Sequence, residues 1–151
     1  ELCPWRRKRL QGEVHDDNSW SFGGVSAHAG LFGSIDDLAL YGLQLRAQLL
    51  GLPGALVQRG TAQRFAQRAV PAAAGDWALG FMLPSPQGAS CGRHFSPRSI
   101  GHTGFTGTSL WYDPERDLLV TILSNRVYGG RENKAFLTLR PQMHDWVVES
   151  L

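Results

Sequence analysis

The chain has 151 residues, enough for one domain or for one part of a larger domain. Hydrophobic residues make up 42% and charged residues 19% of the chain, a balance that supports a packed core and excludes intrinsic disorder. The net charge of +2 favours neither nucleic acid nor a membrane surface as a partner. No stretch reaches the roughly 18 consecutive apolar residues of a membrane-spanning helix. The basic run of residues 5–10 is interpreted as a solvated surface strand or tail, and a phosphate or lipid contact is the alternative.

Residues 1–33 are predicted to form a loop region rich in turns and glycine. The segment "GEVHDDNSW" carries the turn and capping residues Asp16, Asp17, Asn18 and Ser19. The following segment "FGGVSAHAGLFG" holds four glycines in twelve positions. Such a density of glycine indicates close backbone approaches instead of a regular helix or strand.

Residues 34–76 are predicted to be helical, beginning with a helix over residues 34–50. Ser34 is placed to cap this helix, and Gly51 is placed to end it in a left-handed conformation. A second, shorter helix is predicted over residues 60–67. The apolar positions of the first helix recur at intervals of three and four, which predicts a common buried face formed by Ile35, Leu38, Tyr41, Leu45 and Leu49.

Residues 77–125 are predicted to form antiparallel strands, and residues 134–151 a terminal helix. "WALGFML", residues 77–83, is the first strand candidate. The segments 108–113 and 118–125 flank "DPERD", which predicts a β-hairpin with a longer loop. Pro141 leaves open whether the terminal helix starts there or is kinked there. The predicted fold class is therefore α/β (α+β), an antiparallel sheet flanked by helices.

The histidines and cysteines show no established metal-binding spacing. His15, Asp16 and Asp17 are interpreted as turn and capping residues, and His28 as a packed histidine bonded to the backbone. A metal-dependent hydrolase using His15, Asp16 and His28 is the weaker alternative. His94 and His144 are interpreted as ordinary surface residues, and Cys3 and Cys91 as free thiols. No cofactor and no metal site are predicted.

The segment "SIGHTGFTG", residues 99–107, carries the most informative pattern. An edge strand here could pair its exposed backbone with a ligand, and Gly104 would allow a close approach. Thr103 could donate its hydroxyl, His102 could donate a proton or carry a switchable charge, and the backbone N–H of Phe105 could stabilise an oxyanion. The alternative is that the glycines only bend a strand.

The segment "SIGHTGFTGTSLWYDPERDLLVTILSNRV" resembles the C-terminal part of the serine β-lactamase and penicillin-binding-protein superfamily, most of all its class C-like hydrolases and esterases. The Lys-Thr-Gly box of that superfamily stands here as His102, Thr103 and Gly104. "GEVHDDNSWSFGGVSAHAGLFGSIDDLALYG" is similar to the same branch. The resemblance implies an antiparallel sheet covered by helices, with a site beside a helical domain.

The resemblance also implies roles for individual residues. Thr103 would bind a substrate carboxylate or carbonyl, His102 would replace the lysine that keeps the site positive, and the N–H of Phe105 would be half of an oxyanion hole. Residues near the substrate carboxylate would come from "SNRVYGGREN", where the candidates are Asn125, Arg126 and Arg131. For both arginines, surface ion pairing is the alternative.

The superfamily needs a Ser-x-x-Lys motif for its nucleophile, and these 151 residues contain none. We therefore expect the chain to be the C-terminal part of a bacterial serine hydrolase, inactive by itself and completed by an N-terminal portion of the same protein. Its substrate would be a small ester, amide or β-lactam, and the histidine in place of lysine favours an esterase or peptidase. A non-catalytic binding module with the same fold is the alternative. The compartment stays open between the periplasmic or secreted location typical of the superfamily and the cytoplasm.

Overall fold

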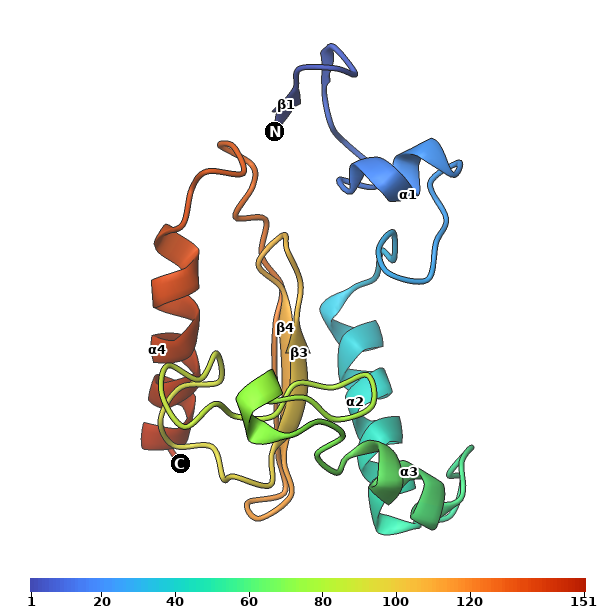
Figure 1. Cartoon of the computed structure of the whole chain (residues 1–151), viewed down its shortest axis with the longest axis vertical. Coiled ribbons are helices and arrows are strands. Elements are labelled where there is room, and N and C mark those ends of the chain that lie inside the picture. Colours follow the sequence, from blue (N-terminus) through green and yellow to red (C-terminus); the bar gives the residue numbers. More distant parts are fainter.

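The computed structural model describes residues 1–151 and places a three-stranded antiparallel sheet between two long helices (Figure 1). The sheet has the order β3-β4-β5, with α2 against one face and α4 against the other. This arrangement confirms the predicted α/β (α+β) class. The sheet and its two helices are β3 (Ile100–Thr103), β4 (Ser109–Asp113), β5 (Leu118–Ile122), α2 (Ile35–Leu50) and α4 (Ala135–Glu149).

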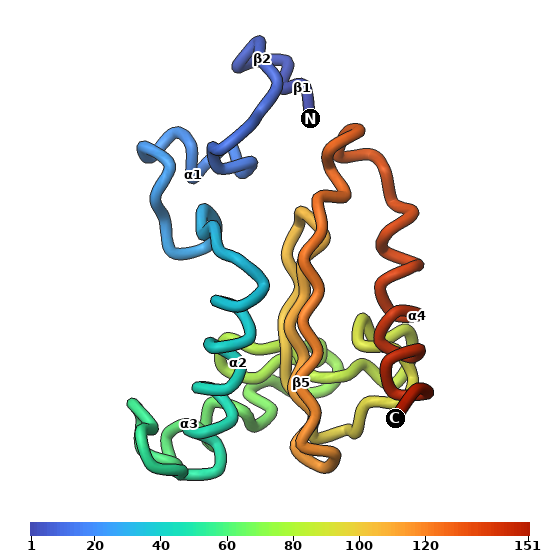
Figure 2. Tube along the Cα trace, turned by 180° about the vertical axis from the view of Figure 1, so that it is seen from behind, coloured from blue at the N-terminus to red at the C-terminus, as the bar shows by residue number.

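Smaller elements complete the chain. A two-stranded hairpin and a short helix lie before α2, and a second short helix and a single 3-10 turn follow it. In Figure 2 the first of these groups stands beyond one end of the sheet, the end at which the loop that leads into α4 also lies. The elements are β1 (Leu2–Cys3), β2 (Lys8–Arg9), α1 (Asp17–Ser21), α3 (Arg59–Phe65) and η1 (Ala72–Ala74).

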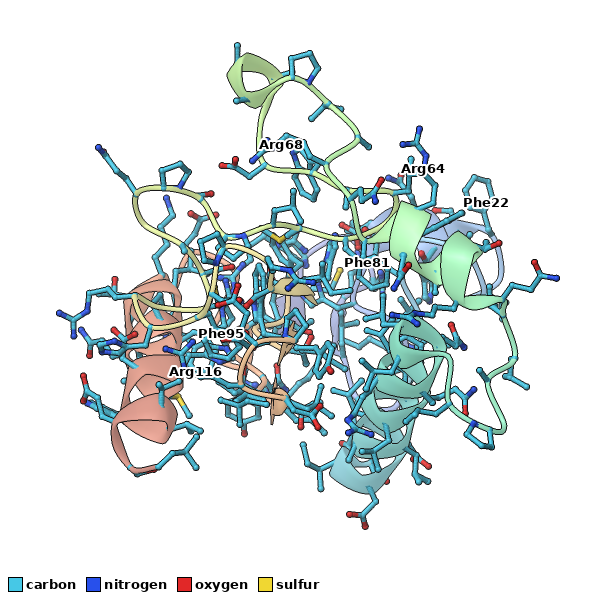
Figure 3. All side chains as sticks on the ribbon, turned by 90° about the horizontal axis from the view of Figure 1, so that it is seen from below. Phe22, Arg64, Arg68, Phe81, Phe95 and Arg116 are labelled. Atoms are coloured by element: carbon cyan, nitrogen blue, oxygen red, sulfur yellow. The ribbon has the colours of Figure 1, made fainter.

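Strand β4 is buried along its whole length because both faces of the sheet are covered. Successive side chains of a strand point to opposite faces, so neighbours on β4 enter different cores. Leu110 joins Leu45, Ile100 and Phe81 on the α2 side. Trp111 packs on the α4 side with a second apolar cluster, which includes Phe95, Cys91 and Val120. Figure 3 shows Phe81 near α2 and α3, and Phe95 nearer to α4.

Helix α2 begins and ends as the sequence predicts. The Ser34 hydroxyl accepts from the Asp37 N–H at 3.2 Å, and the Asp37 carboxylate accepts from the Ser34 N–H at 2.8 Å, which makes a capping box. Gly51 ends the helix at a φ of 69°. The buried face is narrower than predicted, because Ile35 and Tyr41 are exposed. The cluster beneath this helix instead uses Leu38, Leu45 and Leu49.

The predicted strand at residues 77–83 is wrong. This segment forms only isolated bridges, one between Trp77 and Met82 and one between Met82 and Gly101. The intervening Gly80 has a φ of 80°, a turn conformation that brings Trp77 and Met82 opposite each other. The segment therefore folds back on itself before it can extend, although Ala78, Phe81 and Leu83 still join the core on the α2 side.

The terminal helix begins at Ala135 and continues through Pro141, so the proline lies inside the helix. The interpretation of His144 as a surface residue is wrong. Its side chain is fully buried, and its Nε2 lies 3.2 Å from the Ser109 hydroxyl of β4. Burial, and then the charge of Arg140 one turn earlier, lower the pKa of His144 to about 4.

The interpretation of residues 5–10 as solvated is wrong for Arg6. Its side chain is only 1% exposed and donates to the Val14 carbonyl at 2.8 Å and to the Asp17 carboxylate at 2.7 Å. Arg6 thus ties the β1–β2 hairpin to helix α1. Asp16 caps α1 by accepting from the Ser19 N–H at 2.8 Å, which confirms its predicted capping role.

Cys3 and Cys91 are free and fully buried. Burial raises the pKa of Cys91 to about 12. None of the helices combines the length and apolar character needed to cross a membrane.

Asp113, at the end of β4, is a fully buried carboxylate that organises the β4–β5 turn. It accepts hydrogen bonds from the Ser96 N–H at 2.9 Å, the Ser96 hydroxyl at 2.7 Å, the Glu115 N–H at 2.9 Å and the Arg116 guanidinium at 2.9 Å. Arg116 is labelled in Figure 3. Burial by itself would raise the pKa of Asp113, but these bonds hold it below the usual value.

A group with a lowered pKa in the folded state stabilises the fold above its unfolded pKa, and that contribution is lost as pH falls through the folded pKa. We therefore expect Asp113→Asn to cost about 2 kcal/mol at pH 7 and to weaken the acid dependence of stability below pH 4. Urea unfolding at pH 7, 4 and 3 measures both effects. Glu115→Gln, in the same turn but with an exposed side chain, is the control. Equal losses for the two variants would contradict the role given to Asp113.

Candidate functional site

The candidate site begins at the outer edge of β3, which pairs with β4 on one side only. Met82 occupies part of this edge. The Gly101 N–H donates to the Met82 carbonyl at 3.1 Å, and the Gly101 carbonyl accepts from the Met82 N–H at 2.7 Å. Gly101 also needs its lack of a side chain, since a Cβ there would collide with the Trp111 ring and the Leu110 carbonyl. The glycine at 101 is therefore explained by packing inside the chain, and the edge is open only from Thr103 onward.

The turn between β3 and β4 presents Phe105 at its tip. Gly104 N–H donates to the Thr108 carbonyl at 2.8 Å, and Gly107, with a φ of 103°, donates to the Gly104 carbonyl at 3.0 Å. Phe105 is 59% exposed, and its backbone N–H makes no hydrogen bond within the chain. The structure thus holds a free backbone donor next to Thr103.

Arg126 fixes this turn from the loop after β5. Its Nε donates to the Phe105 carbonyl at 2.6 Å, and the guanidinium carbon lies 4.6 Å from the centre of the Phe105 ring. Nη1 donates to the carbonyls of Arg131 and Asn133 at 3.1 and 2.9 Å. Arg126 is therefore not in a surface ion pair; it clamps three backbone carbonyls and orients Phe105.

A pocket of about 600 Å³ lies beside the turn, between it and the start of α4. Figure 1 shows the β3–β4 turn and the loop before α4 at the same end of the sheet. The pocket brings together five of the residues predicted from sequence, namely Thr103, Gly104, Phe105, Arg126 and Arg131. The other lining residues are Glu132, Lys134, Leu137 and Arg140.

Two predicted site residues lie outside this lining. His102 is exposed, with its Nδ1 2.9 Å from the Thr103 carbonyl and its ring 5.9 Å from that of Trp77. The contact with a carbonyl requires a proton on Nδ1. Asn125 is also exposed, and its carbonyl accepts from the Tyr128 N–H at 3.1 Å.

The N-terminal segment contributes a neighbour that sequence reasoning did not place here. The His15 ring lies 5.6 Å from the Phe105 ring, and its Nε2 contacts the Glu1 carboxylate. Glu1 also accepts from the Arg131 Nε at 2.9 Å. Burial would raise the pKa of Glu1, yet these two partners lower it. Residues far apart in the sequence thus meet at Phe105.

His15 and His28 have separate partners. The His28 Nε2 lies 3.0 Å from the Asp16 carboxylate, and its Nδ1 lies 2.7 Å from the Ser26 hydroxyl. His28 is exposed and makes these contacts with side chains, so its interpretation as a packed residue bonded to the backbone is wrong.

Sequence reasoning missed Lys134 and Arg140 in the pocket. For Arg140 the spacing in the sequence shows only that it shares one helix face with His144, four residues further on. That face is the buried one. For Lys134, just before α4, the sequence offered no comparable signal.

Known proteins provide independent comparisons. The family model described as Beta-lactamase matches residues 3–140. A protein from Salmonella gallinarum that carries the provisional name D-alanyl-D-alanine carboxypeptidase is 32% identical over 97% of this chain and 36% of its own length. A Salmonella typhi protein with the same provisional name is 31% identical over the same shares. The chain thus spans about a third of the length of these curated relatives.

A solved structure shows the same fold. A β-lactamase from Mycobacterium bovis superimposes with a TM-score of 0.60 and is 26% identical in sequence. The match covers 81% of this chain and 46% of that protein.

Proposed function

Because the chain belongs to the Beta-lactamase family, we propose that its open β3 edge is the substrate-binding wall of a serine hydrolase. The nucleophile motif, Ser-x-x-Lys, would be supplied from outside these 151 residues. The free N–H of Phe105 is the observation that carries this proposal, because it lies on an exposed turn beside Thr103. Such a backbone donor can stabilise the oxyanion that forms during acyl transfer.

The proposed reaction proceeds through an acyl-enzyme. The serine hydroxyl attacks the carbonyl carbon of an ester or amide, the serine proton passes to the leaving alcohol or amine, and water then releases the acyl group. The Phe105 N–H would hold the carbonyl oxygen as it becomes negative. Thr103 and Gly104 would lie along the substrate, and Arg126 would keep the turn in place through the Phe105 carbonyl.

His102, Asn125 and Arg131 have more distant roles in this proposal. His102 is beside the edge and would tune the charge there without entering the pocket. Arg131 lines the pocket but is engaged by Glu1. Asn125 would act indirectly, through the conformation of the loop that follows β5. The provisional name of the Salmonella relatives makes D-alanyl-D-alanine peptides the first amide substrates to test, alongside simple esters and β-lactams.

A non-catalytic binding module is the second candidate function. It would use the same open edge but lack the nucleophile in every form of the protein. The two candidates differ in one respect that can be checked directly, namely whether the reading frame that contains Glu1 also encodes a Ser-x-x-Lys motif upstream.

The test compares residues 1–151 with the product of the complete reading frame. We expect the isolated chain to give no turnover of nitrocefin, p-nitrophenyl acetate or an acyl-D-alanyl-D-alanine peptide, because it has no nucleophile. The complete product should turn over at least one of them, and replacing the motif serine with alanine should abolish that activity. Turnover by the isolated chain, or an inactive complete product, would contradict the proposal.

A further inference from the structure

Residues 1–33 meet the rest of the chain at the rim of the candidate site. Their ion pairs, side-chain hydrogen bonds and ring contacts with residues 34–151 reach only Phe105, Tyr128 and Arg131. Phe105 lies at the tip of the β3–β4 turn, and the other two residues belong to the loop before α4. Figure 1 shows this N-terminal segment, in blue, beyond the same end of the sheet. The segment is thus placed to act on the turn that carries the Phe105 N–H.

His15 is the side chain that connects this segment to Phe105. The two ring centres lie 5.6 Å apart with 30° between the ring planes, a separation within the range of favourable aromatic pairs. The His15 side chain is only 14% exposed, whereas Phe105 is mostly exposed. An exposed side chain at the tip of a turn can change rotamer, so a contact with a buried neighbour restrains it.

Glu1 anchors the His15 ring in turn. Its carboxylate, which is 9% exposed, accepts from the His15 Nε2 and also from the Arg131 Nε, the latter at 2.9 Å. Donation to this carboxylate requires a proton on the His15 Nε2. Arg131 also lies 3.6 Å from the Asp17 carboxylate. Through Glu1, His15 is therefore anchored both to the N-terminal segment and to the loop before α4.

The Phe105 N–H belongs to the peptide group between Gly104 and Phe105. The carbonyl of that group accepts from the Gly107 N–H at 3.0 Å. Because the peptide group is planar and trans, its N–H points the opposite way. On the other side of Phe105, the Arg126 Nε donates to the Phe105 carbonyl at 2.6 Å. The turn itself and the loop after β5 thus hold the backbone, and His15 adds the restraint on the ring that comes from the N-terminal segment.

We propose that His15 is a positioning residue, which keeps the Phe105 N–H directed at the oxyanion by restraining the Phe105 ring. The catalytic consequence rests on the proposed function, whereas the restraint itself does not. A displacement of about 1 Å can lower the rate of an enzyme by about 100-fold. Because His15→Ala keeps the N–H and the hydrogen bonds of the turn, we expect a smaller loss, about tenfold in kcat, with KM nearly unchanged.

The first experiment measures steady-state kinetics of the complete product with a p-nitrophenyl ester. It compares His15→Ala, Phe105→Ala and the double variant. If His15 acts through the Phe105 ring, adding His15→Ala to Phe105→Ala should lower kcat by less than about twofold, since both changes remove the same contact. His94→Ala is the matched control. His94 also contacts a glutamate, Glu149 at 3.0 Å, but at the far end of α4, so its loss should leave kcat unchanged.

Two further variants separate the ring of His15 from its hydrogen bond. His15→Phe keeps a ring beside Phe105 and loses the bond to Glu1, which still pairs with Arg131. Its kcat should therefore return to within about threefold of the wild-type value. His15→Gln keeps a donor for Glu1 but has no ring, so its kcat should stay low. Thermal unfolding checks that every variant is folded.

The second experiment needs no activity. The complete product is labelled with ¹⁵N in phenylalanine only, and the signal that disappears in Phe105→Ala identifies the Phe105 amide. The heteronuclear NOE of this amide reports motion on the picosecond to nanosecond timescale. We expect the NOE to fall in His15→Ala and to keep its wild-type value in His94→Ala.

The two experiments distinguish this inference from the proposed function. A folded His15→Ala enzyme with a normal kcat, or losses that simply add in the double variant, would overturn the inference while the hydrolase activity stands. If the complete product has no activity but the Phe105 amide becomes more mobile in His15→Ala, the restraint by His15 stands and the proposed function fails. An unchanged NOE in His15→Ala would overturn the inference in either case.

Discussion

Phe105→Pro is expected to lower the kcat of the complete hydrolase by about 100- to 1,000-fold, the range for loss of one oxyanion donor. Proline has no backbone N–H, so this variant removes the one group that the proposed mechanism takes from Phe105. The side chain itself is exposed. Because the donor acts on charge that develops in the transition state, KM should change far less than kcat. Steady-state kinetics with a p-nitrophenyl ester separate the two constants.

Phe105→Ala is the matched control for this effect. It removes the ring that contacts Arg126 and His15 but keeps the N–H. We expect it to lose much less activity than Phe105→Pro. Thermal unfolding of both variants checks that the turn is the only part affected. A folded Phe105→Pro enzyme with a normal kcat would show that the oxyanion is held elsewhere.

Trp111→Ala is expected to lower the free energy of unfolding by about 3–5 kcal/mol, the cost of removing a large aromatic side chain from a core. Trp111 is fully buried at the centre of β4 and packs with Cys91, Phe95 and Val120. A loss of this size is a large share of the roughly 5–15 kcal/mol that stabilises a typical domain. Urea unfolding followed by circular dichroism measures it.

Trp111→Phe distinguishes ring packing from hydrogen bonding. The Trp111 Nε1 is buried without a hydrogen-bond partner, so phenylalanine loses no bond. We expect a cost below about 1.5 kcal/mol for this smaller change in volume. A similar, large loss for both variants would mean that the indole N–H has a partner, and a small loss for Trp111→Ala would place the core elsewhere.

Local signals predicted much of the fold. The capping serine, the glycine at the helix end and the "DPERD" turn each act within a few residues, and the structure places α2, β4 and β5 close to the expected positions. The strand predicted for residues 77–83 is wrong because of contacts that the local sequence does not show. Its apolar composition is that of a strand, but Gly80 turns the chain and Met82 bonds instead to Gly101.

The candidate site shows the same division. The pattern around His102 and Phe105 is contiguous and could be recognised in the sequence. The contacts of Phe105 with His15 and Arg126 join residues separated by 90 and 21 positions, and no periodicity connects them. Burial of Arg140 and His144 also depends on α4 docking against the sheet, because a charged residue is exposed by default.

The buried position of Cys91 protects its thiol from oxidation. A thiol reacts as its thiolate, and a pKa of about 12 keeps this group protonated at neutral pH. Peroxide, disulfide reagents and alkylating agents therefore meet an inert sulfur for as long as the apolar layer between the sheet and α4 stays closed. The same layer that packs Trp111 also makes the folded chain tolerant of both reducing and oxidising surroundings at this position.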